Sequence, residues 1–164
     1  MLQRRDFIKQ ARIVISGTIV PMPLFSNTIT DKMRNEYQYD VIIVGGSSAG
    51  LSAGMALGRA LRKILIIDSG NPCNKQTPRS HNFLTNDGKT PKEIASLAKQ
   101  QVSIYGTVSF LDALVTAGLK LENGLEVQTE SGKKFSARKL VFATGIKDII
   151  PNIPGVTESW GISV

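Results

Sequence analysis

The residues best suited to chemistry form a glycine-rich turn between a short apolar run and a helical pattern. Residues 40–50 read Asp-Val-Ile-Ile-Val-Gly-Gly-Ser-Ser-Ala-Gly, and the four apolar residues are typical of a strand buried on both faces. Helical spacing follows at once. Such a unit can hold a dinucleotide pyrophosphate, because backbone N–H groups and the positive end of the helix dipole face the phosphates. The turn therefore predicts a dinucleotide site.

The turn departs from the usual G-x-G-x-x-G pattern at its middle position. Gly45, Ser47 and Gly50 occupy the three key positions, so serine replaces the glycine that normally lets the backbone approach the pyrophosphate closely. Two interpretations stay open. Either the Cβ atom of Ser47 changes the local geometry slightly, or its hydroxyl group contacts a phosphate oxygen.

A second apolar run ends in an acidic residue. Residues 63–68 read Lys-Ile-Leu-Ile-Ile-Asp and predict another buried strand. Asp68 lies 18 residues after Gly50, where a carboxylate can accept hydrogen bonds from the adenosine ribose. Gly50, Gly54 and Gly58 give the helix between the strands a smooth stripe on which a sheet can pack closely. These segments predict a βαβ unit.

A long loop from Ser69 to Lys89 contains the only histidine of the chain. Loops of this length inside compact domains are often functional. His81 is either a solvated loop residue or, together with Asn82, a neighbour of a flavin ring, and the loop residues alone favour neither interpretation.

The loop ends at a clear helix start. Thr90 is a good N-cap, Pro91 suits the first helical position and Glu93 completes a capping box. The spacing predicts a helix to about Tyr105, with one apolar face that includes Ile94, Leu97, Ala98 and Ile104.

The second half of the chain predicts strands. After a third parallel strand at residues 108–111, residues 115–121 and 125–129 alternate with a period of two around Glu122-Asn123-Gly124, a hairpin signal. Residues 133–136 predict a third antiparallel strand, and residues 140–143 a separate buried strand that ends at Thr144-Gly145. The expected fold is therefore α/β, a Rossmann-like domain with a parallel sheet and an inserted three-stranded antiparallel meander.

Composition excludes several classes of function. The formal net charge of +7 is not gathered into a basic stripe with interleaved aromatic residues, so we expect no nucleic-acid binding. Cys73 is the only cysteine, which excludes an internal disulfide, a CxxC redox pair and a cysteine-based zinc site. We expect no metal. Any redox chemistry must use a cofactor.

The first 30 residues have the layout of an export signal. Arg4 and Arg5 precede Phe7, Ile8 and Lys9, which resembles the twin-arginine signal of bacteria. The uncharged stretch from residue 13 to residue 30 contains two prolines and makes a poor membrane span.

We therefore expect a signal peptide at residues 1–30, a linker at 31–38 and a folded domain at 39–164. Localisation is then periplasmic or exported. The alternative is a cytoplasmic protein, in which the first segment is a disordered leader, or a protein that keeps this segment as an uncleaved anchor.

The glycine turn, the acid-ended strand, the meander and Ala143-Thr144-Gly145 together resemble the FAD domain of flavoproteins that bind two dinucleotides. Residues 80–91 and 153–161 resemble, more specifically, the thioredoxin reductase-like branch of the FAD/NAD(P)-dependent pyridine nucleotide-disulfide oxidoreductases, which includes related dithiol oxidases. Members of this branch pass hydride from NADPH to the flavin and then electrons to a disulfide or another acceptor. The resemblance also implies a homodimer.

The resemblance implies a set of FAD contacts but assigns no catalytic residue. It places Gly45, Gly46, Ser47, Ser48, Ala49 and Gly50 around the pyrophosphate, Asp68 at the ribose, Asn74, His81 and Asn82 near the flavin, and Ala143, Thr144 and Gly145 over the FAD.

The 164 residues lack the family's NADPH domain, its CxxC pair and its last FAD-binding segment. We therefore expect the FAD-binding part of an oxidoreductase, active only in a longer protein or with a partner that supplies the NAD(P)H domain. The alternative is a non-catalytic FAD- or nucleotide-binding module, or an inactive truncated product. A Rossmann enzyme that uses NAD directly is disfavoured by the meander and by the Ala-Thr-Gly segment.

Overall fold

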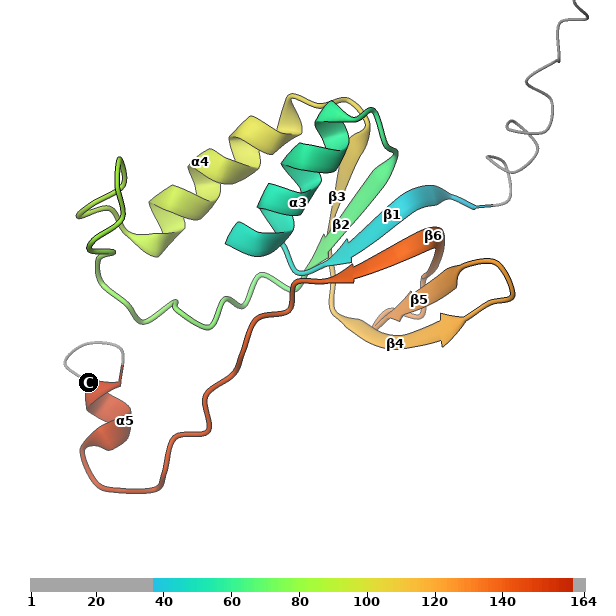
Figure 1. The fold of residues 1–164 in the computed structure, drawn as a ribbon. Helices are drawn as coiled ribbons and strands as arrows, with labels where there is room; N and C mark the ends of the chain where they lie inside the picture. Colours follow the sequence, from blue (N-terminus) through green and yellow to red (C-terminus); the bar gives the residue numbers. More distant parts are fainter. Residues whose placement is uncertain (1–36, 161–164) are drawn as a thin grey trace, which may run out of the picture.

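A single six-stranded sheet organises the domain (Figure 1). The computed structural model describes residues 37–160. In sheet order the strands are β3 (Val108–Asp112), β2 (Ile64–Asp68), β1 (Tyr39–Val44), β6 (Lys134–Phe142), β5 (Leu125–Thr129) and β4 (Val115–Lys120). The helices are α3 (Ser48–Arg59), α4 (Pro91–Ser103) and α5 (Val156–Ser159). The expected α/β class is confirmed. The predicted signal peptide and most of the predicted linker lie outside the described residues.

The parallel half of the sheet contains the βαβ unit that the sequence predicts. Strand β1 pairs in parallel with β2 and β6, and β2 pairs in parallel with β3. Helices α3 and α4 lie side by side on one face of these strands (Figure 1). Ile43, Ile64 and Ile66 are fully buried there with Leu51 of α3 and Val102 of α4. Among the described residues, no helix is long and apolar enough to cross a membrane.

The antiparallel strands pack on the opposite face of the parallel strands. Ile42, Leu65 and Ile67 point away from the helices and are buried with Val127 of β5 and Ala137 of β6. Figure 1 shows β4 and β5 on that side of the domain. The predicted meander therefore supplies the second cover that a central parallel sheet requires.

One prediction about the strands is wrong in detail. Residues 133–136 and 140–143 were expected to form two strands, but residues 134–142 form the single strand β6. Ala137 pairs with Leu125 of β5 in antiparallel register and with Tyr39 of β1 in parallel register. Arg138 and Lys139 interrupt the apolar pattern without interrupting the backbone, because this segment contains no glycine or proline. Phe142, expected to be buried, is 74% exposed.

The glycine stripe of α3 lets the helix lie close to the sheet, as the sequence predicts. A Cβ atom on Gly54 would lie 2.7 Å from Cδ1 of Ile66, and one on Gly58 would lie 2.9 Å from Cγ2 of Val108. A side chain at either position would force these neighbouring methyl groups to move. The helix therefore packs against the β2 and β3 side chains through its backbone.

Helix α4 begins as predicted but ends earlier and is less covered. The Thr90 hydroxyl oxygen accepts the Glu93 N–H at 3.2 Å, while Oε2 of Glu93 accepts the Thr90 N–H at 2.8 Å, which completes the capping box. The helix ends at Ser103 rather than near Tyr105. Of the residues expected on its apolar face, Ile104 is 75% exposed and Leu97 is 43% exposed.

Replacing Gly54 with valine tests the close packing of α3. We expect Gly54→Val to lower the free energy of unfolding by about 1–3 kcal/mol, because the new side chain overlaps Ile66. Gly106→Val is the matched control, since a Cβ atom on Gly106 has no neighbour within 4 Å. Urea unfolding of both variants measures the difference, and equal losses would contradict the packing explanation.

Removing the Thr90 cap has a pH-dependent cost. The backbone N–H and the hydroxyl of Thr90 donate hydrogen bonds that lower the pKa of Glu93 below its ordinary value. This contribution to stability is present above the ordinary pKa of a glutamate and is lost as the pH falls through the lowered pKa. We expect Thr90→Ala to cost about 1 kcal/mol near neutral pH and less in acid, because alanine loses the hydroxyl but keeps the backbone N–H, and urea unfolding measures both losses. Ser96→Ala, on an exposed turn of α4, is the control.

Candidate dinucleotide-binding site

The predicted glycine turn is held between the two strands that flank β1. The Gly45 N–H donates a hydrogen bond to the Ile67 carbonyl oxygen on β2 at 2.8 Å, and the Ala143 N–H beyond β6 donates one to the Val44 carbonyl oxygen at 2.8 Å. The ends of β2, β1 and β6 are thereby joined at one edge of the sheet. In open α/β sheets, ligands bind in the crevice outside this carboxyl edge.

Gly45 gives the turn its shape. Its φ is +106°, a conformation that residues with a side chain rarely adopt. A Cβ atom at this position would also collide with the Ala143 carbonyl oxygen. The turn therefore packs directly on the Ala143-Thr144-Gly145 segment, and the structure brings together two of the predicted contact regions.

The N-terminus of α3 leaves hydrogen-bond donors facing outward. Ser47 is the N-cap residue, with φ −89° and ψ −167°, and its side chain makes no capping hydrogen bond. Ser47, Ser48 and Ala49 are exposed, whereas Gly50 is buried. The first N–H groups of a helix have no partner within the helix, so these backbone donors suit an anion such as a pyrophosphate. The role of the Ser47 hydroxyl stays a prediction.

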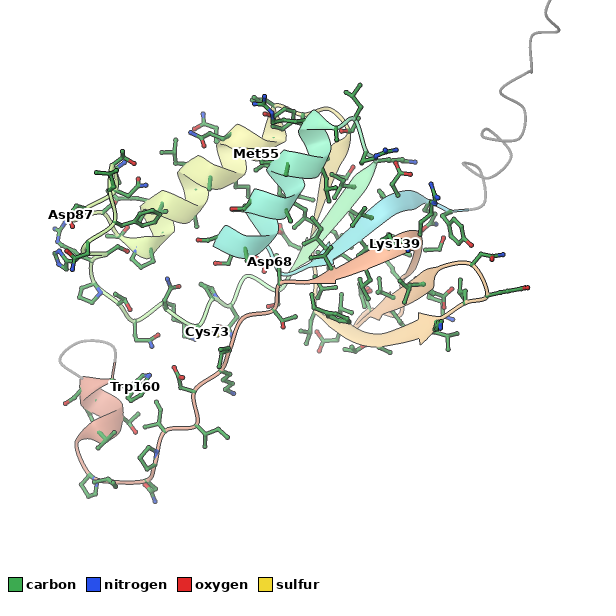
Figure 2. All side chains as sticks on the ribbon, in the orientation of Figure 1. Met55, Asp68, Cys73, Asp87, Lys139 and Trp160 are labelled. Atoms are coloured by element: carbon green, nitrogen blue, oxygen red, sulfur yellow. The ribbon has the colours of Figure 1, made fainter. Side chains whose placement is uncertain are left out.

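Asp68 lies beside the turn at the end of β2 (Figure 2). A Cβ atom on Gly46 would lie 2.9 Å from the Asp68 Cβ atom, so a side chain at position 46 would displace the carboxylate. The carboxylate is half-buried. Asp68 therefore has the position expected of a ribose-binding acid relative to the pyrophosphate turn.

Sequence reasoning missed two charged residues next to Asp68. Asp112 ends β3 in register with Asp68, and Lys99 of α4 places its Nζ atom 3.6 Å from Asp112 Oδ1 and 5.2 Å from the centre of the Phe110 ring. Asp68, Lys99 and Asp112 share a small cavity of about 20 Å³ with Gly46 and Phe110. Asp112 directly follows the third predicted strand, as Asp68 ends the second, and this repeated placement could have indicated that the two acids lie side by side.

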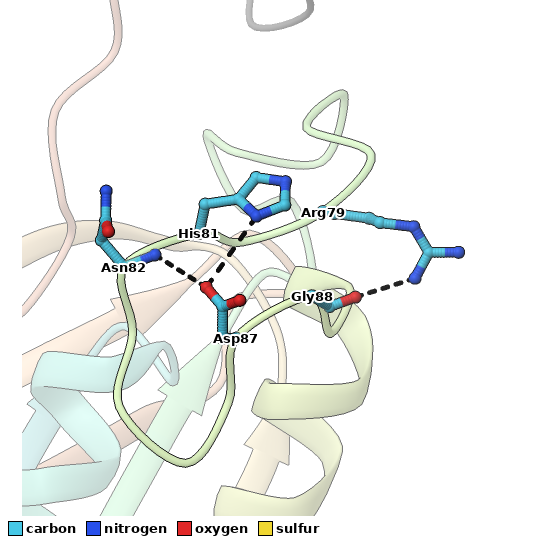
Figure 3. Close-up of polar contacts among 5 residues, drawn as sticks. All are labelled: Arg79, His81, Asn82, Asp87 and Gly88. Atoms are coloured by element: carbon cyan, nitrogen blue, oxygen red, sulfur yellow. Dashed lines mark hydrogen bonds and ion pairs between the residues drawn. The ribbon is translucent and has the colours of Figure 1, made fainter.

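The loop that contains His81 and Asn82 is closed on itself (Figure 3). The Ser80 N–H donates to the Lys89 carbonyl oxygen at 2.8 Å. Asp87 Oδ1 accepts the Asn82 N–H at 2.9 Å and lies 3.9 Å from His81 Nδ1. Both predicted flavin neighbours are thus held in one place, with exposed side chains.

Asn74 lies in the earlier part of the same connection. Its carbonyl oxygen accepts the Thr77 N–H at 3.1 Å, and its side chain is exposed. Among residues 37–160, no hydrogen bond joins Asn74, His81 or Asn82 to the glycine turn. The structure therefore brings together the residues predicted to contact the pyrophosphate and the ribose, but no hydrogen bond joins the three predicted flavin neighbours to the glycine turn.

The sequence patterns also did not predict a second groove, which lies between the loop at residues 71–76 and the segment at residues 147–160 that includes α5. Cys73 and Trp160, both labelled in Figure 2, line the same groove, which has a volume of about 530 Å³. Cys73 is exposed. In the part of the chain that the structure describes, no three potential metal ligands lie together.

The sheet, the turn at its carboxyl edge and the inserted antiparallel strands define a dinucleotide-binding α/β domain. The chain belongs to the family described as pyridine nucleotide-disulphide oxidoreductase, which matches it over residues 39–164. It is similar to a protein of Arthroderma benhamiae named "Probable thioredoxin reductase", with 39% identity over 132 residues, and to thioredoxin reductase aclD of Aspergillus oryzae, with 36% identity over 129 residues. These alignments cover 77% of this chain but only 33% and 41% of the two relatives.

Solved structures support the same family. An oxidoreductase from Agrobacterium tumefaciens superposes with a TM-score of 0.73 and 40% identity, over 76% of this chain and 42% of that protein. A thioredoxin reductase from Gloeobacter violaceus gives a TM-score of 0.62 and 29% identity, over 76% and 42%. The chain therefore has the fold of thioredoxin reductase-like proteins and spans about two-fifths of the length of these two structures.

Replacing Gly45 with alanine tests the turn. We expect Gly45→Ala to lower the free energy of unfolding by about 1–3 kcal/mol from backbone strain, and further because its Cβ atom meets the Ala143 carbonyl group. Gly70→Ala is the control, because Gly70 also has a positive φ but has no atom within 4 Å of a new Cβ. If the two variants lose equal stability in urea unfolding, contact between the turn and Ala143 is not needed to explain the effect.

Proposed function

We propose that this chain is the FAD-binding part of an NAD(P)H-dependent flavoprotein oxidoreductase of the thioredoxin reductase-like type. In this proposal, electrons pass from NAD(P)H through FAD to a disulfide or another acceptor. The observation that carries it is the junction of the Gly45 turn with Asp68 on one side and Ala143 on the other. This junction places helix N-terminal donors beside a carboxylate at the end of the second strand, the arrangement of dinucleotide-binding folds.

The choice of FAD as the bound dinucleotide depends on two further features. The family is FAD-dependent. In addition, Ala143-Thr144-Gly145 follows β6 directly beside the glycine turn, and β6 is reached through the antiparallel insertion. The insertion and the second turn argue against a Rossmann enzyme that uses NAD directly in this cradle.

The residues present have separable roles in this proposal. The N–H groups at the start of α3 bind the pyrophosphate, Asp68 orients the ribose, and Thr144-Gly145 closes over the cofactor. The bound FAD supplies reversible two-electron redox chemistry. His81 and Asn82, held by Asp87, are the proposed neighbours of the flavin ring. No residue is assigned to proton transfer.

A second candidate function is a non-catalytic FAD- or nucleotide-binding module. It is favoured by the single cysteine: Cys73 has no second thiol in this chain with which to exchange a disulfide. The DNA downstream of codon 164 separates the candidates. An in-frame continuation that encodes a second glycine turn favours the oxidoreductase.

Cofactor binding tests the assignment of Asp68. We expect the purified chain to bind FAD, and Asp68→Asn to weaken binding by roughly 10- to 100-fold, because a hydrogen bond to a charged group contributes about 1.5–3 kcal/mol. Glu122→Gln makes the same chemical change at the distant hairpin turn and should leave affinity unchanged. Quenching of FAD fluorescence measures both. A wild-type chain that remains colourless after reconstitution with FAD would exclude both candidates.

Anaerobic reduction tests whether this chain also accepts NADPH. We expect NADPH to leave the flavin absorbance of the 164-residue chain unchanged, because the one glycine-turn cradle within residues 37–160 is assigned to FAD. Dithionite, which needs no binding site, should bleach the flavin and serves as the control. Bleaching by NADPH would show that this chain holds a nicotinamide site of its own.

A further inference from the structure

A groove runs between α3 and α4 on the helical face of the domain. Its volume is about 470 Å³, within the range of small-molecule sites, and residues 83–89 of the loop close one end of it. Met55, on the α3 side of the groove, is labelled in Figure 2. The groove meets the proposed FAD site only at Ser48.

The floor of the groove is apolar and incompletely covered. Leu51 and Val102 form its buried base, and Leu97 on α4 and Phe83 in the loop remain 43% and 46% exposed at its sides. Leu97 belongs to the predicted apolar face of α4, which the rest of the domain therefore covers only in part. The groove presents apolar surface that an apolar molecule could cover.

The rim of the groove carries a single charge. Lys89 is the only charged residue of the lining, and its half-buried Nζ atom donates a hydrogen bond to Asn86 Oδ1 at 3.0 Å. None of the ion pairs within residues 37–160 includes Lys89. Glu93, the nearby acid, is outside the lining. Its carboxylate accepts hydrogen bonds from Thr90, and the charge of Lys89 also contributes to lowering its pKa. The lining of the groove therefore contains one cationic side chain and no carboxylate.

We propose that this groove binds a small amphipathic anion, independently of FAD. The apolar body of the ligand lies along Leu51, Met55 and Leu97, and its carboxylate or comparable anionic group binds Lys89. An anion is favoured because an apolar groove with one cation and no acid in its lining is electrostatically complementary to a single negative charge. Ser48 and Ser52 add hydroxyl groups at the same end of α3.

A pair of dyes of similar shape tests both parts of the proposal. 8-Anilinonaphthalene-1-sulfonate is an amphipathic anion, and N-phenyl-1-naphthylamine is its uncharged counterpart. With saturating FAD present throughout, we expect the anionic dye to bind with a stoichiometry of one and the neutral dye to bind more weakly. FAD occupies its own proposed site throughout, so a loss of dye binding reports a change in the groove and not a failure to bind the cofactor.

Variants then separate charge from apolar contact. Lys89→Gln should lower the affinity for the anionic dye at least fivefold and change the affinity for the neutral dye less than twofold. Lys92→Gln, at an exposed position outside the lining, should change neither affinity. Leu97→Glu, at a half-exposed position that tolerates a polar side chain, should weaken both dyes. Circular dichroism and thermal unfolding confirm that each variant is folded.

Competitors identify the source of the anion. Sodium decanoate should displace the anionic dye, and 1-decanol at the same concentration should not. Displacement by phosphatidylglycerol vesicles instead of decanoate would also support the site but identify a lipid head group as its ligand. The proposal would be overturned if wild type and Lys89→Gln bound each dye equally well. It would also be overturned if neither decanoate nor vesicles displaced the anionic dye.

Discussion

The central position of β1 is the constraint on which the rest of the domain depends. Because β1 pairs with β2 on one side and β6 on the other, the turn after Val44 is tied to both neighbouring strands by backbone hydrogen bonds. Those bonds place the start of α3, Asp68 and Ala143 around one point at the sheet edge. A shift of β1 by one residue in either ladder would exchange its two buried faces and separate the three groups.

Much of this arrangement could be predicted from the chain because its signals are local. The apolar runs before Gly45 and Asp68, the Asn123-Gly124 turn and the Thr90 cap each specify their own structure through neighbouring residues. The structure contains all four of these features where the sequence predicts them. The meeting of the Gly45 turn with Asp68 follows, since parallel strands bring their carboxyl ends to one edge.

Features that depend on contacts between distant segments could not be predicted in the same way. Arg138 and Lys139 look like a break between strands, and only pairing with both β1 and β5 shows that β6 is continuous. Lys99 reaches Asp112 because α4 packs beside β3, which its own helical periodicity does not reveal. The groove by Lys89 likewise depends on how α3 and α4 pack together, and no local sequence motif predicts it.

The continuity of β6 has a consequence for how the chain folds during synthesis. Tyr39 of β1 pairs with Ala137 of β6, which is made 98 residues later, so the central strand lacks one neighbour until most of the chain is available. Contacts this distant in sequence close slowly. Strand β6 pairs with β1 in the parallel part of the sheet and with β5 in the antiparallel part. Its pairing therefore joins the two parts of the sheet at the same time. The domain therefore completes the strand edge that carries the glycine turn and its second sheet cover in the same late step.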